Sequence, residues 1–139
     1  MCAVKIKGLD KLLIELRDLP KQVEKEAIAQ LKVICDEILA DALSRVPVRM
    51  GELKGSGRVK VIKGGYSVGF EIFYAPYVEF GTGDFVVVPQ GYESFAMEFF
   101  VSGEGKSRPQ PFLFPAFLAK RDNIVKEIEQ KINGLLKSK

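Results

Sequence analysis

Two short patterns in this chain resemble parts of nucleotide-binding motifs. The tripeptide GKS at 105–107 has the ending of a P-loop, in which backbone amides and a lysine hold phosphates at the start of a helix. The full motif requires glycine at the position of Phe100, and Pro109 and Pro111 oppose a helix directly after the lysine. The tripeptide GTG at 81–83 is a fragment of a dinucleotide fingerprint and does not lie between a strand and a long helix. Both patterns are more typical of loops and corners.

The residues that perform acid–base or nucleophilic catalysis are sparse. The chain has no histidine, which excludes Ser-His and Cys-His pairs, and two cysteines far apart cannot form a structural zinc site. Glu71, Glu79 and Asp84 supply carboxylates, but no spacing marks them as an acid–base pair. We therefore predict a protein that is not an enzyme, with no catalytic residues, no cofactor and no metal site.

Charge is distributed unevenly along the chain, although the net charge is only +3. Residues 44–63 hold six basic residues against one acidic residue, and residues 71–105 hold six acidic residues and no basic one. Two patches of opposite charge are what a head-to-tail ring requires, because each subunit then joins two different surfaces. A homo-oligomeric ring is therefore one expectation.

The basic segment has two interpretations. It supplies positive charge that could contact DNA phosphates, and a nucleic-acid-binding module is the alternative function. It also alternates with valines, as in a sheet with one solvated face. The residues that would face DNA or a protein partner are Arg45, Arg49, Lys54, Arg58, Lys60 and Lys63.

Apolar periodicity predicts the helices. Leucines recur at helical spacing between positions 9 and 19, and a longer amphipathic pattern covers residues 20–45 before Pro47 ends it. A final helix is expected from Pro115 onward, and residues 50–57 are predicted to form a loop because they contain three glycines. The sequence thus predicts two helices before the strands and one after them.

The strands are predicted from alternation between apolar and polar residues. Residues 58–62 and 66–73 alternate on either side of Gly64-Gly65, which predicts a hairpin. Residues 85–88 and 95–101 are predicted as two further strands, and residues 77–80 as either a sheet extension or a helical turn. The predicted fold class is α+β, with helices on one face of an antiparallel sheet in the order α-α-β-β-β-β-α and one domain over residues 1–139. The predicted core contains Leu31, Ile34, Ile38, Val61, Phe70, Phe80, Phe114 and Phe117.

Four segments in fixed order resemble the tail-component family of long-tailed bacteriophages and prophages. They are residues 8–12 (GLDKL), 45–53 (RVPVRMGEL), 74–82 (YAPYVEFGT) and 111–116 (PFLFPA). The YVEFGT corner and the PFLFPA helix entry are the most specific of these, while Arg49 and Met50 depart from the family's usual pattern in the second segment. The residues that carry the resemblance are Pro47, Gly51, Leu53, Pro76, Tyr77, Val78, Glu79, Phe80, Gly81, Thr82, Pro111, Phe112 and Pro115.

The resemblance implies a structural virion protein of the head–tail junction or of tail completion, with no catalytic residues to carry over. Its implied partners are neighbouring neck and tail proteins, such as the tail terminator and head-completion proteins, with at most weak nonspecific DNA contact. The implied location is the host cytoplasm during assembly and then the virion. No apolar run approaches the roughly 18 residues of a membrane span, so no membrane partner is expected. The prolines and Gly81 are expected to bend the chain and orient the last helix.

Overall fold

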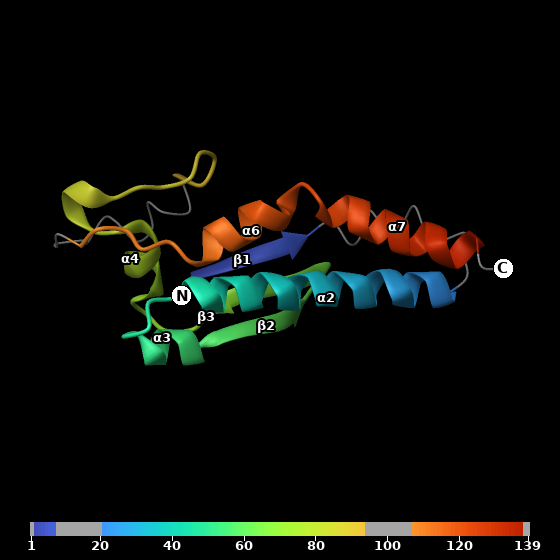
Figure 1. Ribbon diagram of the computed structural model, residues 1–139, viewed down its shortest axis with the longest axis horizontal. Helices are drawn as coiled ribbons and strands as arrows, with labels where there is room; N and C mark the ends of the chain where they lie inside the picture. The colour runs from blue at the N-terminus through green and yellow to red at the C-terminus, as the bar shows by residue number, and fades with distance from the viewer. Residues whose placement is uncertain (1, 8–20, 94–106, 138–139) are drawn as a thin grey trace.

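The computed structural model describes residues 2–7, 21–93 and 107–137 of the chain (Figure 1). It contains a three-stranded sheet, a long helix and several shorter helices. In chain order the elements are β1 (Cys2–Lys7), α2 (Lys21–Arg45), α3 (Gly51–Gly55), β2 (Gly57–Ile62), β3 (Gly65–Phe70), α4 (Ala75–Phe80), the 3-10 turn η1 (Gly83–Phe85), α6 (Leu113–Arg121) and α7 (Ile124–Lys137).

The sheet is antiparallel and has the order β1-β3-β2, so β3 is the central strand. One row of partners across the sheet is Val4, Val68 and Val59. The next row is Lys5, Ser67 and Lys60. Because side chains alternate between the two faces of a strand, the first row points to the core and the second row to the opposite face. Val68 is fully buried, while Lys5 and Lys60 are exposed.

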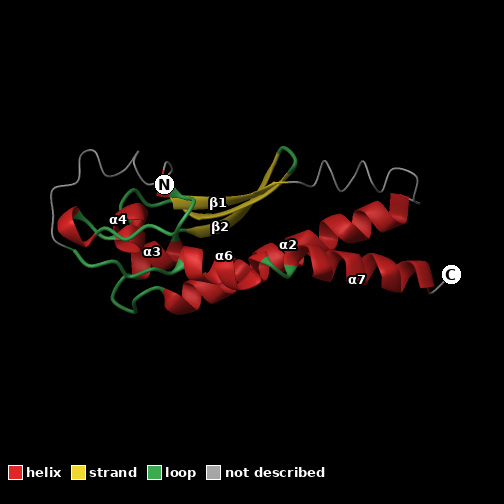
Figure 2. Cartoon of the chain, turned by 90° about the horizontal axis from the view of Figure 1, so that it is seen from above, coloured by secondary structure: helices red, strands yellow, loops and turns green. Residues whose placement is uncertain are grey.

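The helices form one layer on the core face of the sheet (Figure 2). Helix α2 packs against β2, β3, α6 and α7, and both α2 and α7 extend past the end of the sheet. Buried residues recur every three or four positions along α2, which gives it one continuous apolar face. They are Val23, Ala27, Leu31, Ile34, Cys35, Ile38 and Ala42.

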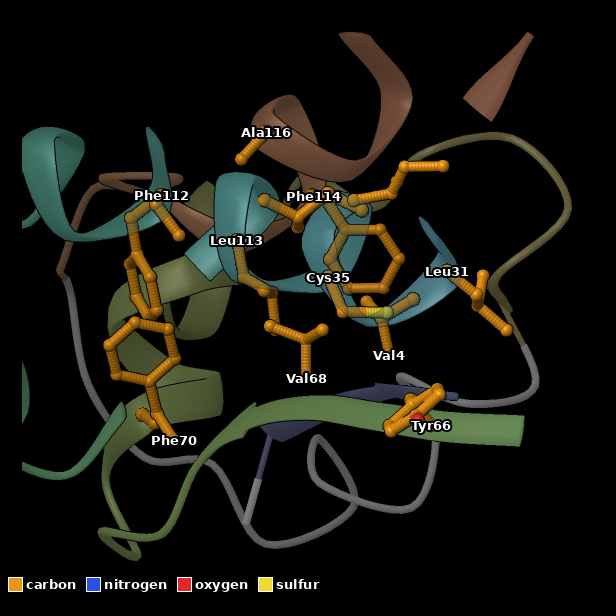
Figure 3. Close-up of a cluster of buried hydrophobic side chains, with 14 of the residues drawn as sticks. Val4, Leu31, Cys35, Tyr66, Val68, Phe70, Phe112, Leu113, Phe114 and Ala116 are labelled. Carbon is orange, nitrogen blue, oxygen red and sulfur yellow. The ribbon is translucent and has the colours of Figure 1, made fainter. Parts of the chain in front are cut away.

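The core lies between the sheet and the helix layer (Figure 3). Phe70 of β3 and Phe112, just before α6, meet edge to face with ring centroids 4.7 Å apart. Six of the eight predicted core residues are buried: Leu31, Ile34, Ile38, Phe70, Phe80 and Phe114. Phe117 is half-buried against the core, and the prediction for Val61 is wrong, because its side chain is 79% exposed on an edge strand.

The predicted α+β class is confirmed, but the sheet has three described strands instead of four. Strand β1 was not predicted, although Val4 and Lys5 have the alternation of a half-buried strand. Residues 85–88 do not form the predicted strand, because the chain makes the η1 turn at residues 83–85 and then continues without a partner among the described strands. The predicted helix over residues 9–19 and strand over residues 95–101 lie outside the described residues.

Three further predictions concern short or broken helices. Residues 75–80 form α4, which resolves the choice between strand and helical turn, and Pro76 suits the first turn because it has no N–H to donate. Residues 51–55 form the short helix α3 instead of a loop. The final helix is two helices, because residues 122 and 123 form a turn in which the Asn123 N–H donates to the Lys120 carbonyl. The predicted helix over residues 20–45 and the hairpin are confirmed as α2, β2 and β3.

Candidate functional site

Three of the motif segments, far apart in the sequence, meet at one end of the molecule. This end, here called the motif end, consists of residues 46–50, 71–82 and 107–114. A shallow hollow at this end is lined by residues from all three segments: Arg49, Met50, Tyr74, Tyr77, Val78, Ser107, Arg108 and Gln110. Figure 1 shows the same convergence, with α3 and α4 lying together at the end of the molecule opposite the C-terminus.

Glu79 joins the second of these segments to the third. Its side chain is 2% exposed, and its carboxylate accepts three backbone N–H groups at the start of α6. Oε2 accepts from Phe112 at 2.9 Å and Leu113 at 3.0 Å, and Oε1 accepts from Phe114 at 2.9 Å. These N–H groups have no partner within the helix, so a carboxylate from another element satisfies them. Glu79 therefore fixes the position of α6 relative to α4.

The electrostatics of Glu79 follow from this position. Burial raises the pKa of the Glu79 carboxyl above its ordinary value, and the three backbone N–H donors act in the opposite direction. The positive end of a helix dipole favours a negative charge at the same place. With both carboxylate oxygens engaged by backbone N–H groups, Glu79 is a structural residue of the motif end.

The Gly81-Thr82 corner makes a second connection. The Thr82 N–H donates to the Ser107 carbonyl at 2.9 Å, and the Ser107 N–H donates to Thr82 Oγ1 at 2.8 Å. Gln110 adds a bond from its N–H to the Val78 carbonyl at 2.8 Å. Gly81 has φ +81°, and an added Cβ would lie 2.9 Å from the Ser107 carbonyl oxygen and from Pro109. The corner therefore needs glycine for two independent reasons.

The segment 45–53 contributes the turn between α2 and α3. Pro47 lies just after α2, and its carbonyl accepts the Met50 N–H at 2.9 Å. Leu53 of α3 is fully buried in the core. Gly51 begins α3 with open space around its Cβ position, so neither its contacts nor its space requires glycine. The contacts of this segment therefore set the local shape of the turn between α2 and α3.

The remaining motif residues are divided between core and surface. Pro76, Phe80 and Phe112 are buried, Tyr77, Val78 and Pro115 are half-buried, and Pro111 is exposed. The predicted burial of Phe80 is thus confirmed, whereas Tyr77 reaches the surface hollow of the motif end.

The basic segment is spread over several elements, and part of its charge is already engaged. Arg45 pairs with Asp41 at 3.0 Å, and Lys60 pairs with Glu71. Arg58 donates to the carbonyls of Gly55 and Gly57 at 2.8 Å and 2.7 Å. The three remaining basic residues are exposed: Arg49 before α3, Lys54 within it and Lys63 in the hairpin turn. The pair between Lys60 and Glu71 also joins the predicted basic and acidic segments within one subunit.

The exposed apolar residues of this region were not predicted from the sequence. Phe73 is 77% exposed and Val48 is 97% exposed, and both lie in turns of the motif end. Val87, 63% exposed, follows the η1 turn. The sequence signal for exposed apolar residues was the aromatic run from Phe70 to Phe80. The turn after β3 determines which of these side chains enter the core and which reach the surface.

Chemistry at this site is limited by the contacts of the acidic residues. Glu79 accepts backbone N–H groups and Glu71 pairs with Lys60, so these two carboxylates are engaged in separate interactions. Over residues 2–7, 21–93 and 107–137, no group of three or more histidine, cysteine or acidic side chains is arranged to hold a metal ion. No helix in the described part of the chain is long and apolar enough to cross a membrane.

The described residues form an α+β fold whose motif end presents apolar and basic side chains such as Val48, Phe73 and Arg49. The family model described as "Bacteriophage HK97-gp10, putative tail-component" matches residues 10–81, and the chain belongs to this family. The match includes the whole 45–53 segment and the 74–82 segment except for its last residue, and it ends before the 111–116 segment. The resemblance seen in the motifs is thereby confirmed, and the protein is a phage tail component. Neither a curated protein nor a solved structure matches the chain.

Proposed function

We propose that this tail component acts at the head–tail junction or in tail completion, by assembling with neighbouring virion proteins. The observation that carries the proposal is the motif end, where Val48 and Phe73 are exposed on turns held by fixed backbone contacts. Side chains that are apolar, exposed and preorganised are typical of the anchors of protein interfaces. The partners would be a tail terminator or head-completion proteins, with copies of the chain arranged in a ring.

DNA contact would be weak and nonspecific in this role. Arg45 and Lys60 are already paired with carboxylates, and Arg58 is bonded to backbone carbonyls. These contacts favour the solvated-face interpretation of the basic segment over a nucleic-acid-binding module. The protein would be made in the host cytoplasm and incorporated into the virion.

Deleting the gene from a phage that carries it tests the role. We expect electron microscopy to show full heads and tails that are separate, and expression of the intact chain in trans to restore joined particles. Joined, infectious particles in the absence of the chain would contradict the proposed function.

A pair of surface variants tests whether the motif end carries that role. Val48→Asp changes an exposed residue of the motif end, and Val33→Asp changes a residue of α2 that is 46% exposed. We expect Val33→Asp to complement the deletion and Val48→Asp to fail, with both purified proteins folded by circular dichroism. Equal complementation by the two variants would place the assembly surface elsewhere.

A measurement of DNA binding distinguishes the proposed assembly function from the alternative, a nucleic-acid-binding module. A nucleic-acid-binding module should bind duplex DNA tightly at low salt and lose affinity steeply as salt rises. We expect weak binding that Lys60→Gln leaves nearly unchanged, because Lys60 is paired with Glu71. Tight, salt-dependent binding that this substitution weakens would favour the alternative.

A further inference from the structure

We propose that the Phe73 side chain of one copy inserts into an apolar hollow on the next copy, and that this contact joins copies head to tail. The inference rests on the proposed assembly function and adds the contact that joins one copy of the chain to the next. In this contact, apolar complementarity supplies the main attraction.

The receiving hollow lies between α4, the segment after η1 and the start of α6. Its volume is about 240 Å³. Its walls are almost entirely apolar: Phe80, Val87, Pro89, Pro109, Pro111, Phe114, Pro115 and Leu118, together with Glu79. Four prolines hold the walls in fixed backbone conformations, so the hollow is preformed.

The inserting residue is equally well positioned. Phe73 is 77% exposed, and its ring rests edge-on against Tyr74 with centroids 5.4 Å apart. The turn that presents it is fixed by a bond from the Glu71 N–H to the Ser56 carbonyl at 3.1 Å and one from the Ala75 N–H to the Ile72 carbonyl at 3.2 Å. A rigid aromatic side chain loses little conformational freedom when it binds, which suits an interface anchor.

Size and polarity match between the two surfaces. A cavity of about 150 Å³ lined by aliphatic and aromatic side chains is enough to bind benzene. The larger hollow can therefore take a phenyl ring together with part of its backbone. Val87 is itself 63% exposed, so the contact would remove apolar surface from water on both copies.

The two surfaces lie on different sides of α4. In Figure 1 the strand end and α3, which flank the turn carrying Phe73, lie on one side of α4, and the segment after η1 lies on the other. Phe73 is not among the residues that line the hollow of its own copy. A contact between two different surfaces repeats from copy to copy and forms a ring when the rotation closes.

Charge contributes little to this contact. Glu71, two residues before Phe73, is paired with Lys60 of the same copy, and its hydrogen bond with Lys60 lowers its pKa. Arg108, next to the hollow, lies over the Phe85 ring at 5.1 Å from its centroid. The affinity of the contact is therefore mainly apolar.

Cysteine cross-linking tests the contact between copies. In a Cys2→Ser background, Glu71→Cys and Val87→Cys are made as separate proteins, so that both keep Phe73. Cys35 does not interfere, because it is buried and burial raises the pKa of its thiol to about 11. We expect a mixture of the two proteins to form a disulfide-linked dimer under mild oxidation, and each protein alone to form far less. Equal cross-linking by Glu71→Cys alone would indicate a two-fold contact and would overturn the inference.

Sedimentation tests the affinity. We expect Phe73→Ser to weaken association by about 30-fold or more, as for an interface hot spot. The matched control is Val125→Ser, which changes a 62% exposed residue of α7. Mixing Phe73→Ser with Val87→Asp should restore a dimer but not a larger ring, since one intact hollow and one intact Phe73 remain. A chain that stays monomeric up to about 1 mM and gives no cross-link would overturn the inference.

The copy-to-copy contact and the head–tail junction role can be disproved separately. If copies do not associate but the gene deletion still separates heads from tails, the copy-to-copy contact is wrong and the junction role stands. If copies associate through Phe73 but the deletion leaves joined particles, the contact stands and the junction role is wrong.

Discussion

The sheet with its helix layer and the motif end are held together by different interactions. In the first region, apolar side chains such as Val68 and Ile38 are fully buried between two layers of regular structure. In the second region, short turns are joined by backbone hydrogen bonds and by the buried carboxylate of Glu79. Apolar burial is not directional, so the layered region depends on volume and tolerates similar apolar residues.

The motif end depends on geometry instead. A hydrogen bond requires a donor and an acceptor at the correct distance and angle, so one misplaced atom leaves a buried polar group without a partner. The comparison predicts that volume changes damage the layered region most, while nearly isosteric changes damage only the motif end.

The largest effect is expected from Phe70→Ala in the layered region. Phe70 is fully buried and packs against Phe112, so the substitution leaves a cavity and should lower the free energy of unfolding by about 3–5 kcal/mol. Phe73→Ala is the matched control, since this exposed phenylalanine should change stability by less than about 0.5 kcal/mol. Urea unfolding of both variants measures the difference, and similar losses would contradict the assigned burial.

A substitution that keeps the side-chain volume should destabilise the motif end, which depends on hydrogen-bond geometry, more than it would destabilise the layered region. Glu79→Gln keeps the volume but turns an amide NH₂ toward backbone N–H donors, so at least one donor loses its acceptor. We expect a loss of about 2 kcal/mol, the cost of an unsatisfied buried polar group. Amide exchange at residues 112–114 should accelerate in the variant. Glu129→Gln, on the exposed surface of α7, is the control, and unchanged exchange in Glu79→Gln would show that the carboxylate does not hold α6.

Substitutions at two glycines should have smaller and opposite effects on stability. Gly81→Ala places a Cβ against Pro109 and the Ser107 carbonyl at a positive φ, which should cost about 1–3 kcal/mol. Gly55→Ala adds a Cβ in open space within α3 and should stabilise the protein by about 0.4–1 kcal/mol. Thermal unfolding should therefore shift in opposite directions, and a shift of Gly81→Ala to higher temperature would rule out the strained corner.

The smallest expected effect concerns Cys35 in the layered region. Burial, and then the charge of Asp36, raises the pKa of its thiol from 9.0 to about 11. The native thiol should therefore react slowly with iodoacetamide at pH 8 and quickly in urea, in a Cys2→Ser background. Because the folded state favours the neutral thiol, its contribution to stability is present below pH 9 and lost as the pH rises toward 11. The stability difference between this protein and its Cys35→Ala variant should narrow over that range; a constant difference would contradict the shift.

The layered region was predictable because its signals are local. The apolar spacing of α2 and the alternation around Gly64 reflect which face of a helix or strand is buried, so both elements were predicted correctly. Val61 shows where the argument fails. It alternates like a buried residue, yet it is exposed near the end of the edge strand β2.

The motif end was predictable in composition but not in contacts. The YVEFGT and PFLFPA segments were singled out from the sequence, and the family match confirms the assignment to which they led. That Glu79 of the first segment holds the helix start in the second segment was not predictable, because 33 residues separate Glu79 from Phe112 and no local pattern encodes the pairing.

The sequence by itself determined the α+β class, the long helix, the central hairpin and the family, because these depend on periodicities and motifs within short stretches of chain. The tertiary structure alone decided which phenylalanines are buried, which charges are already paired and which segments form one surface. Phe70 and Phe73 illustrate the reason: they are the same residue type three positions apart, and only the turn after β3 sends one into the core and the other into solvent.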